Sequence, residues 1–349
     1  MSNTNYARHV YTPHEVGMAG YKEAQRVQEA RKTGINLPHI DGCDAAEYFA
    51  RLMPWEVCEV LAQTHNGKTL FADWWENGIC KQLQDEGRGD ECVIHVSLEE
   101  SLEAMSFYQH AKVLKVSPSA IANGDVSLDQ MRLSMVEIDK IPIYRIADSS
   151  GLEDDEDQPE LYLSNIYRII RSLKDGAVTG EKIKPAVVFV DYLQALPYDP
   201  ETRKEQEDGK RRIQVRKDVY RLRQMTVHLE CPIIVNVQAK QKLEGNTLPF
   251  YIPGNYDGEE TSAIAQRFDR IISLWMPKNN YPIGTNKEGV GSITDDLCYM
   301  KVGKQRGGYP SGKSWALRWD YEARHLMSIY GATVAEKDAA AQRWQSQTK

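Results

Sequence analysis

The sequence predicts an α/β fold with a mostly parallel central sheet covered by helices. Eight short runs rich in apolar and β-branched residues alternate with segments of helical periodicity. These runs are apolar on both faces, as the strands of a parallel sheet buried between helices must be. With 349 residues, of which 41% are hydrophobic, the chain can bury a large core as one domain or two smaller ones.

The first predicted element is a helix over residues 13 to 33, which lies ahead of the sheet. Thr12 is suited to the N-cap, Pro13 to the first helical position and Glu15 to the third. Gly34 can end the helix. The strands are predicted at residues 56–61, 92–97, 141–146, 186–191, 232–237, 270–275, 297–302 and 314–319. A helix is expected in LFADWWENGICKQL after residue 69, and another has an apolar face formed by Val215, Val219, Leu222 and Leu229.

Composition argues against a membrane or secreted protein. No stretch approaches the roughly 20 apolar residues of a membrane span, and the N-terminus MSNTNYARHV lacks the apolar core of a secretory signal. A cytoplasmic location without membrane contact is therefore expected. The cysteines form no C-x-x-C pair, which indicates reduced thiols in or near the core rather than disulfides or a structural metal site. Lys and Arg number 43 against 50 for Asp and Glu, so any nucleic-acid contact must be local.

Residues 62 to 69, AQTHNGKT, have the pattern of a nucleotide-binding P-loop. Gly67, Lys68 and Thr69 match the last three positions of G-x-x-x-x-G-K-[ST], and Ala62 replaces the first glycine. Such a loosened pattern arises by chance in roughly a few per cent of chains of this length. The preceding strand and the following helix favour the P-loop over a chance string in an ordinary turn. The predicted loop comprises Ala62, Gln63, Thr64, His65, Asn66, Gly67, Lys68 and Thr69.

Two acidic residues follow predicted strands at the same edge of the sheet. Asp191 ends the strand AVVFVD, where a carboxylate can hold Mg²⁺. Glu99 lies just beyond CVIHVS, where a carboxylate can activate water. Ligands of open α/β sheets gather at these carboxyl ends. Taken alone, a buried strand that merely ends in Asp is the commoner case.

Seven segments in fixed order resemble the C-terminal RecA-type motor domain of the DnaB-type replicative helicases, the hexameric ring helicases that include phage primase-helicases. They are LAQTHNGKT, HVSLEE, IPIYRIADSS, VVFVDYLQAL, ECPIIVNVQAKQK, EETSAIAQRFDRIISLW and KVGKQRGGYPSG. The resemblance covers roughly residues 34 to 330. Asn236 stands where the family usually has Ser, and Arg267 where an acid is more usual. The family's N-terminal helical domain has no counterpart in the sequence, so the usual primase partnership is not implied.

The resemblance implies an ATP-hydrolysing enzyme that uses Mg²⁺. Lys68 and Thr69 match the residues that bind the phosphates and Mg²⁺. Glu99 matches the catalytic base and Asp191 the Walker B acid, which also contacts the metal site. Gln238 matches the sensor of the γ-phosphate.

The resemblance also implies a homo-oligomer, a hexameric ring whose active sites are shared between subunits. Lys304 and Arg306 match the pair that reaches into the neighbouring subunit's site, with Arg306 as the arginine finger. A finger supplied in trans makes hydrolysis depend on assembly. Without the other segments, a solvent-exposed basic hairpin is the commoner interpretation of KQRGG.

Single-stranded DNA is the implied partner, bound by two loops that line the pore of the ring in the family. Basic residues outnumber acidic ones between residues 201 and 217 in a chain of net charge −7, as a groove that follows a phosphate backbone requires. A flexible charged loop next to a helix is an equally good interpretation. The candidate DNA-binding residues are Arg203, Lys204, Lys210, Arg211, Arg212, Lys240 and Lys242.

The expected organisation has three parts: an N-terminal arm and linker helix (1–33), a RecA-like ATPase domain (34–330) and a C-terminal tail (331–349). Two functions remain open on the sequence. One is a ring-forming helicase or translocase that moves on single-stranded DNA and acts in DNA replication. The other is a RecA-like ATPase that uses nucleotide as an assembly or signalling switch without unwinding. An intact set of hydrolytic residues favours the motor, and the acidic composition leaves room for the switch.

Overall fold

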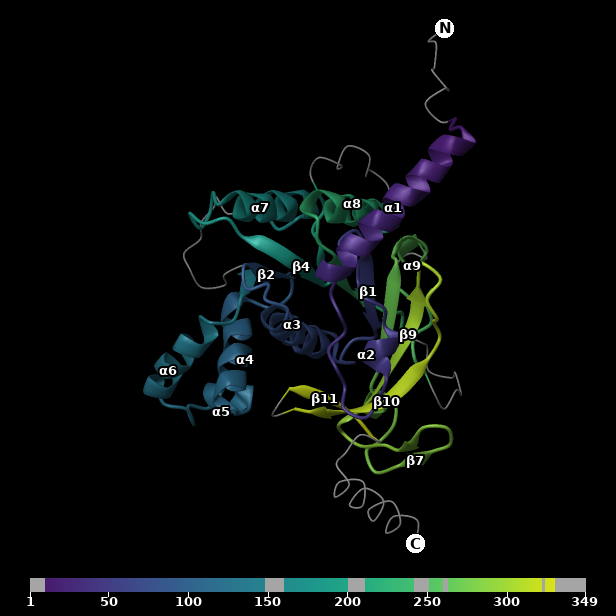
Figure 1. The fold of residues 1–349 in the computed structure, drawn as a ribbon. Coiled ribbons are helices and arrows are strands. Elements are labelled where there is room, and N and C mark those ends of the chain that lie inside the picture. The colour runs from purple at the N-terminus through teal and green to yellow at the C-terminus, as the bar shows by residue number, and fades with distance from the viewer. Residues whose placement is uncertain are drawn as a thin grey trace.

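A large mixed sheet forms the centre of the computed structural model, which describes residues 10–147, 160–199, 211–241, 251–259, 263–321 and 324–329 (Figure 1). The strand order is β11-β10-β9-β6-β1-β5-β4-β2-β3. Neighbouring strands are parallel from β6 to β3, and β9, β10 and β11 join antiparallel. The strands are β1 Val57–Ala62, β2 Glu91–Ser97, β3 Ile143–Ile146, β4 Lys184–Asp191, β5 Ile233–Gln238, β6 Arg270–Trp275, β9 Leu297–Gln305, β10 Ser314–Asp320 and β11 His325–Ser328, with β7 Asn286–Lys287 and β8 Gly291–Ser292 forming a separate hairpin.

Helices fill the connections between the parallel strands, as parallel pairing requires. The helix α3 begins directly after the loop that follows β1, and α4 to α6 form an excursion between β2 and β3 that projects from the sheet edge (Figure 1). The helices are α1 Pro13–Thr33, α2 Ala45–Tyr48, α3 Lys68–Asp85, α4 Leu102–Leu114, α5 Pro118–Ala122, α6 Leu128–Ile138, α7 Leu163–Asp175, α8 Arg211–Leu229 and α9 Ala263–Arg267.

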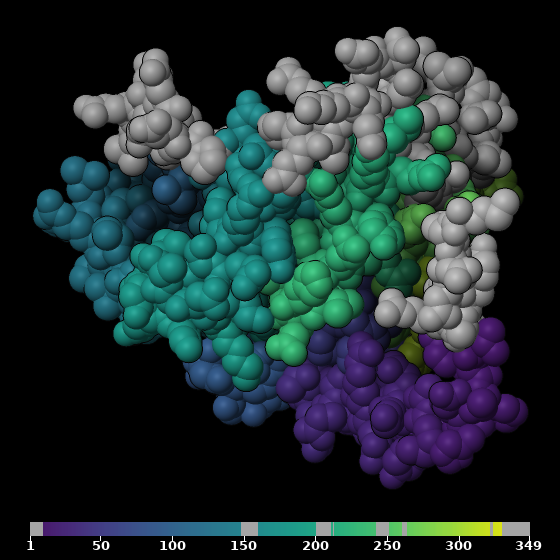
Figure 2. Space-filling view, turned by 90° about the horizontal axis from the view of Figure 1, so that it is seen from above, coloured from purple at the N-terminus to yellow at the C-terminus, as the bar shows by residue number. Residues whose placement is uncertain are grey.

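A hydrophobic core lies on each face of the sheet. On one face, α3 packs through side chains such as Phe71 and Trp75, which are fully buried. On the other face, α7 and α8 pack through side chains such as Ile166 and Val219. Figure 2 looks onto this second face, where α7 and α8 lie side by side. The two cores hold the carboxyl ends of β1, β2, β4 and β5 at one edge, where the active site is expected.

The helix α1 projects from the molecule, and among the described residues its contacts with the domain lie toward its C-terminal end (Figure 1). Its start matches the prediction, because Thr12 and Glu15 form a capping box and Pro13 is the first helical residue. Ala30 is its single buried residue. The guanidinium of Arg26 lies over the Trp55 ring, with Cζ 3.8 Å from the centroid. The C-terminal part of α1 therefore contacts its own domain, and its N-terminal part is exposed.

Each of the eight predicted strands is present, and the mostly parallel α/β class is confirmed. The runs at 297–302 and 314–319 form β9 and β10, which are antiparallel. Their connection has only residues 306–313, too short for the crossover that a parallel pair needs. All six cysteines are free thiols, as expected. Within the described part of the chain, no helix is both long and apolar enough to cross a lipid bilayer.

Candidate active site

The loop predicted at residues 62 to 69 joins the end of β1 to the start of α3. Gly67 precedes the helix with a φ of 78°, a left-handed conformation that glycine adopts without strain. A Cβ atom on Gly67 would lie 2.6 Å from Met276 Cε, so a side chain there would also require this flexible methionine to move. Lys68 and Thr69 are the first residues of α3. Backbone N–H groups at a helix start have no helical partner and favour anions, so the loop has the form of a phosphate-binding turn.

The segment after β6 supports this loop from one side. Asn66 is buried, and its Oδ1 accepts a hydrogen bond from Met276 N at 2.7 Å. The other end of the same amide donates to Thr64 O at 3.0 Å. Asn279 Nδ2 donates to His65 O at 2.9 Å. These three bonds hold the turn in its shape.

Lys68 lies folded within the loop, close to three carboxylates. Its Nζ donates to Ala62 O and to Gln63 O, both at 3.2 Å. Burial lowers the pKa of Lys68, and the negative charges of Asp191, Glu99 and Glu259 oppose that effect. An ammonium group at this position is placed to reach the β- and γ-phosphates of a bound nucleotide.

Thr69 and Asp191 form the part of the site that fits a divalent cation. Thr69 Oγ1 donates to Asp191 Oδ2 at 2.8 Å, which joins the start of α3 to the end of β4. Mg²⁺ prefers hard oxygen ligands, and nucleotide sites hold it with one or two protein oxygens and the phosphates. The hydroxyl and the carboxylate therefore fit Mg²⁺. When bound, the ion neutralises charge that develops on the phosphates.

Glu99 lies beside this pair, just beyond β2. Ser97 of β2 pairs with Asp191 of β4 in the sheet, and Leu98 N donates to Asp191 O at 2.8 Å. Glu99 itself is exposed, where it can meet an attacking water. The next residue, Glu100, is half-buried, and its pKa is raised by burial and by the charge of Asp191. The two adjacent glutamates thus differ in environment.

Gln238 connects the end of β5 to the P-loop. Its Nε2 donates to Thr64 Oγ1 at 2.9 Å. Gln63 Nε2 donates to Lys240 O at 3.0 Å, so a second bond joins the same two segments. A side chain in contact with the phosphate-binding loop can respond to the γ-phosphate, as a sensor must.

Two residues of the site were not predicted. Gln194 exchanges hydrogen bonds with the Gln238 backbone, donating to its oxygen at 3.1 Å and accepting from its nitrogen at 3.0 Å. Glu259 N donates to Gln238 O at 2.8 Å, and the Glu259 charge acts on Lys68. Both lie inside segments that carry the family resemblance, VVFVDYLQAL and EETSAIAQRFDRIISLW. The signal that could have identified Gln194 and Glu259 is that each is a polar residue within a segment of the family resemblance.

Lys304 and Arg306 lie away from the P-loop of their own chain. Arg270, the first residue of β6, pairs with Cys58 of β1 and with Gln305 of β9. The P-loop begins at Ala62, four residues further along β1, which is roughly 13 Å at about 3.3 Å per residue. Lys304 and Arg306 therefore lie level with the amino-terminal ends of β1 and β6, whereas the phosphate-binding turn lies at the carboxyl-terminal end of β1.

Both cations of this pair contact acceptors of their own chain around α9. Lys304 Nζ donates to Ala265 O and Phe268 O, both at 2.6 Å. Arg306 Nη2 donates to Gln266 O at 2.6 Å, and its Nη1 lies 3.2 Å from Asp269 Oδ1. Burial lowers the pKa of Lys304, and the positive charge of Arg306 adds to this effect.

Most of the candidate DNA-binding residues lie outside the described part of the chain. These are Arg203, Lys204, Lys210 and Lys242, and for Arg212 only the backbone is described. Lys240 is exposed. Arg211 donates to Leu196 O at 2.9 Å and to Gln194 O at 2.6 Å, so its guanidinium already serves the segment after β4.

Two polar residues are buried inside the strands below the site. Glu59 of β1 is fully buried, and neither of its carboxylate oxygens has a hydrogen-bond partner among the described residues. Burial raises the pKa of Glu59 to about 8, against an opposing effect of the Lys304 charge. Asn236 of β5, where the family usually has Ser, is buried with both amide atoms unpartnered within the same residues.

The P-loop, the Thr69–Asp191 pair and the Glu99 segment meet at the carboxyl edge of a mostly parallel sheet. This fold and this site define a P-loop NTPase of RecA-like architecture.

The family model of the DnaB-like helicase C terminal domain matches residues 48–325, and the chain belongs to this family.

Two solved structures share the fold at low sequence identity. An ATPase domain has a TM-score of 0.65 and 17% identity over 90% of this chain and 98% of its own. A DnaB-like replicative helicase, solved to describe its interactions with primase, has a TM-score of 0.60 and 17% identity over 79% of this chain. The match spans 59% of that helicase. A search of curated proteins gave no match.

Proposed function

We propose that the chain is a subunit of an ATP-driven ring that moves along single-stranded DNA, as a helicase or translocase of DNA replication. The observation that carries this proposal is the division of the hydrolytic residues between two edges of the sheet. Lys68, Thr69 and Asp191 converge at one edge, whereas Arg306 follows the end of β9, which lies level with Cys58, four residues or roughly 13 Å before Ala62 along β1, and its side chain is bonded to Gln266 O. Such a chain completes a site only with a second copy.

Within one subunit, the P-loop edge supplies binding and water activation. Lys68 binds the β- and γ-phosphates, and Thr69 and Asp191 hold Mg²⁺. Glu99 accepts a proton from the attacking water, because it is an exposed carboxylate next to the phosphate site. Gln238 reads the γ-phosphate through its contact with Thr64.

The neighbouring subunit supplies Lys304 and Arg306. Arg306 neutralises the negative charge that grows on the phosphoryl oxygens in the transition state, an effect worth about 10³ or more in rate. Lys304, near the end of β9 and two residues before Arg306, adds a second positive charge. This arrangement makes hydrolysis conditional on assembly.

Two exposed apolar surfaces support assembly through α1. A soluble domain rarely leaves such a set of large side chains without a partner. On α1 these are Val16, Met18 and Tyr21, and on α6 they are Leu128, Leu133, Met135 and Val136. We place α1 of one subunit on the α4–α6 excursion of its neighbour, with residues 1–33 acting as arm and linker, 34–330 as motor domain and 331–349 as tail.

DNA binding rests on the loops after β4 and β5. Lys240, which is exposed and bonded through its carbonyl to Gln63, joins the P-loop to the loop after β5. A phosphate backbone held near Lys240 would thus feel the state of the nucleotide site. Arg203, Lys204, Lys210, Arg212 and Lys242 complete the proposed basic strip.

The mass of the assembly tests the proposal most directly. We expect a hexameric ring in the presence of a non-hydrolysable ATP analogue and single-stranded DNA, and ATPase activity that rises with DNA. An ATPase that ignores DNA and never forms rings would indicate the nucleotide-dependent switch instead.

Mixing two inactive variants tests the shared site. Arg306→Ala keeps its own P-loop but lacks the finger, whereas Lys68→Ala keeps the finger but lacks the P-loop lysine. A mixture contains interfaces where both halves are intact, so we expect part of the ATPase activity to return. As a control, wild type mixed with either variant must lose activity nonlinearly, which shows that subunits exchange. Given that control, no recovery at any ratio would refute the shared site.

A further inference from the structure

Gln305 lies between Lys304 and Arg306 and points the other way. Lys304 and Arg306 both reach backbone oxygens of residues 265–268. Gln305 instead reaches the end of α2 at Tyr48 and the segment that follows it at Ala50. This alternation is what a strand imposes on successive side chains. The residue between the two proposed trans-acting cations is thus anchored on the opposite side of β9.

The Gln305 amide uses its full hydrogen-bonding capacity. Its Oε1 accepts from Ala50 N at 2.9 Å and from Arg270 Nη1 at 2.8 Å. Its Nε2 donates to Tyr48 O at 3.0 Å and to Pro310 O at 2.6 Å. An amide side chain offers two donors and two acceptor sites, and all four are engaged. The Gln305 side chain therefore joins the end of β9 and the turn at Pro310 to Tyr48, Ala50 and Arg270.

Arg270 lies at the centre of this hydrogen-bond network and has no exposed surface. Its Nε and Nη2 donate to the Glu56 carboxylate, at 3.1 and 3.0 Å, and its Nη1 serves Gln305. Its Cζ lies 5.6 Å from the centre of the Phe49 ring and 5.1 Å from that of Tyr309. A guanidinium has a planar, rigid set of donors, so these partners are fixed relative to one another.

Stability alone does not account for this network. Replacing a buried ion pair by apolar residues of similar volume is often neutral or stabilising, because both charges must leave water. What Arg270 contributes is the fixed orientation of its hydrogen-bond partners, which include Gln305.

We propose that Arg270 and Gln305 are positioning residues that fix Lys304 and Arg306 in the orientation needed at the neighbouring subunit's nucleotide. This inference rests on the proposed function, in which the pair acts in trans. A displacement of a reacting or stabilising group by about 1 Å can cost 10²-fold in rate, so a rigid anchor behind the finger has a direct catalytic consequence.

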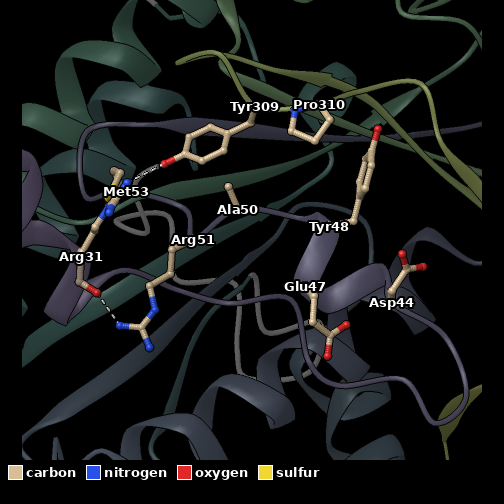
Figure 3. A pocket seen from close by; sticks show the side chains of 9 residues that line it. All are labelled: Arg31, Asp44, Glu47, Tyr48, Ala50, Arg51, Met53, Tyr309 and Pro310. Atoms are coloured by element: carbon tan, nitrogen blue, oxygen red, sulfur yellow. Dashed lines mark hydrogen bonds between the residues drawn. The ribbon is translucent and has the colours of Figure 1, made fainter.

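The outer side of the same turn cannot provide this anchor. Tyr309 and Pro310 line an open hollow of about 560 Å³, whose other walls come from α1, α2 and the segment before β1 (Figure 3). Across it, the Tyr309 hydroxyl accepts one bond from Arg31 of α1 at 3.3 Å. The turn is thus thinly supported outside and fully bonded inside. On the inner side, the Gln305 and Arg270 bonds act together with the bond from Arg306 N to Asp269 O at 3.0 Å.

The test is the mixing experiment proposed for the shared site, and it measures how well the donor's Arg306 supports turnover in the acceptor's nucleotide site. The acceptor is Arg306→Ala, so turnover occurs in its intact P-loop and depends on a finger from the donor. The donors carry Lys68→Ala alone or together with Gln305→Leu, Gln305→Glu or Arg270→Met. A matched control donor carries Lys68→Ala with Arg88→Met, because Arg88 is also buried and paired with a carboxylate, Glu91, and lies outside the network.

We expect the Gln305→Leu and Arg270→Met donors to lower the recovered kcat by about tenfold to a hundredfold, with the KM for ATP unchanged because the P-loop belongs to the acceptor. Gln305→Glu retains the acceptor bonds but turns its second carboxylate oxygen toward the carbonyl oxygens of Tyr48 and Pro310, so it should also lower the recovered kcat. The Arg88→Met donor should match Lys68→Ala alone. Thermal unfolding of each donor identifies variants that fail to fold, and Gln305→Glu then carries the comparison.

Two outcomes separate this inference from the function on which it rests. If the Lys68→Ala donor restores turnover and the folded Gln305 and Arg270 donors restore it equally well, the positioning role is wrong and the shared site stands. If the Lys68→Ala donor itself restores nothing, the shared site is wrong. A change in KM without a change in kcat would also overturn the positioning role.

Discussion

Glu59 gives the molecule a testable dependence of stability on pH. This residue lies in the middle of β1, paired in the sheet with Val235 and Ile271, and is fully buried. Burial raises its pKa from 4.5 to about 8, and the positive charge of Lys304 only partly opposes this effect. Near neutral pH the carboxyl group is therefore mostly protonated in the folded protein and ionised in the unfolded one.

The size of the effect follows from proton linkage. The folded and unfolded pKa values differ by about 3.5, and each pKa unit corresponds to about 1.4 kcal/mol. Because the folded pKa is the higher one, the stabilising contribution is complete below pH 4.5 and is lost as pH rises to about 8. Glu59 alone should thus lower the free energy of unfolding by about 5 kcal/mol across that range.

Glu59→Gln removes the titration and retains the volume. In urea unfolding from about pH 5 to about pH 9, we expect the variant to become more stable than wild type as pH rises, by several kcal/mol at the upper end. Glu29→Gln, at a glutamate whose side chain is 77% exposed, is the matched control and should follow wild type at every pH. A difference between wild type and Glu59→Gln that stays constant with pH would refute the reasoning.

Three further predictions concern the active site and assembly. Lys68→Ala and Asp191→Ala should each lower ATP hydrolysis by about 10²-fold or more without unfolding the domain. Lys174→Ala, at a lysine that also donates to a backbone carbonyl, is the control and should leave ATP hydrolysis unchanged. Undiminished turnover in Lys68→Ala would contradict the P-loop assignment. Gly67→Ala should weaken ATP binding, because of the positive φ and the Met276 contact, and an unchanged dissociation constant in titration would count against this. Deletion of residues 1–33 should give a folded monomer by light scattering, and rings of unchanged size would reject the linker role of α1.

The parts that the sequence predicts well have strong local signals. The P-loop needs a strand, a glycine with positive φ and a helix start within a few residues, and all three occur around Gly67. The capping box at Thr12 is likewise a local pattern that forms as expected. The strand ends that carry Asp191 and Gln238 meet because parallel strands share one carboxyl edge.

Features that depend on distant contacts could not be predicted. The strand of Glu59 reads as an apolar run, and nothing local shows that this carboxylate stays inside the protein. The roles of Gln305 and Arg270 arise only when β6 and β9 pair. The α4–α6 helices were not predicted although Ser101, Ser117 and Ser127 cap their starts, whereas the four residues of β11 carry a pattern too weak to separate from a loop.

The attachment of α1 makes it a lever. Its 21 residues span roughly 31 Å at about 1.5 Å each, and its contacts with the domain lie near its C-terminal end, where Arg26, Ala30 and Arg31 meet the domain. From the middle of these contacts to Pro13 the helix extends roughly 22 Å, so a tilt of about 10° there would move the far end by roughly 4 Å. One of these contacts is Tyr309, three residues beyond Arg306. The single bond from Arg31 to the Tyr309 hydroxyl thus joins α1 to the turn that carries the arginine.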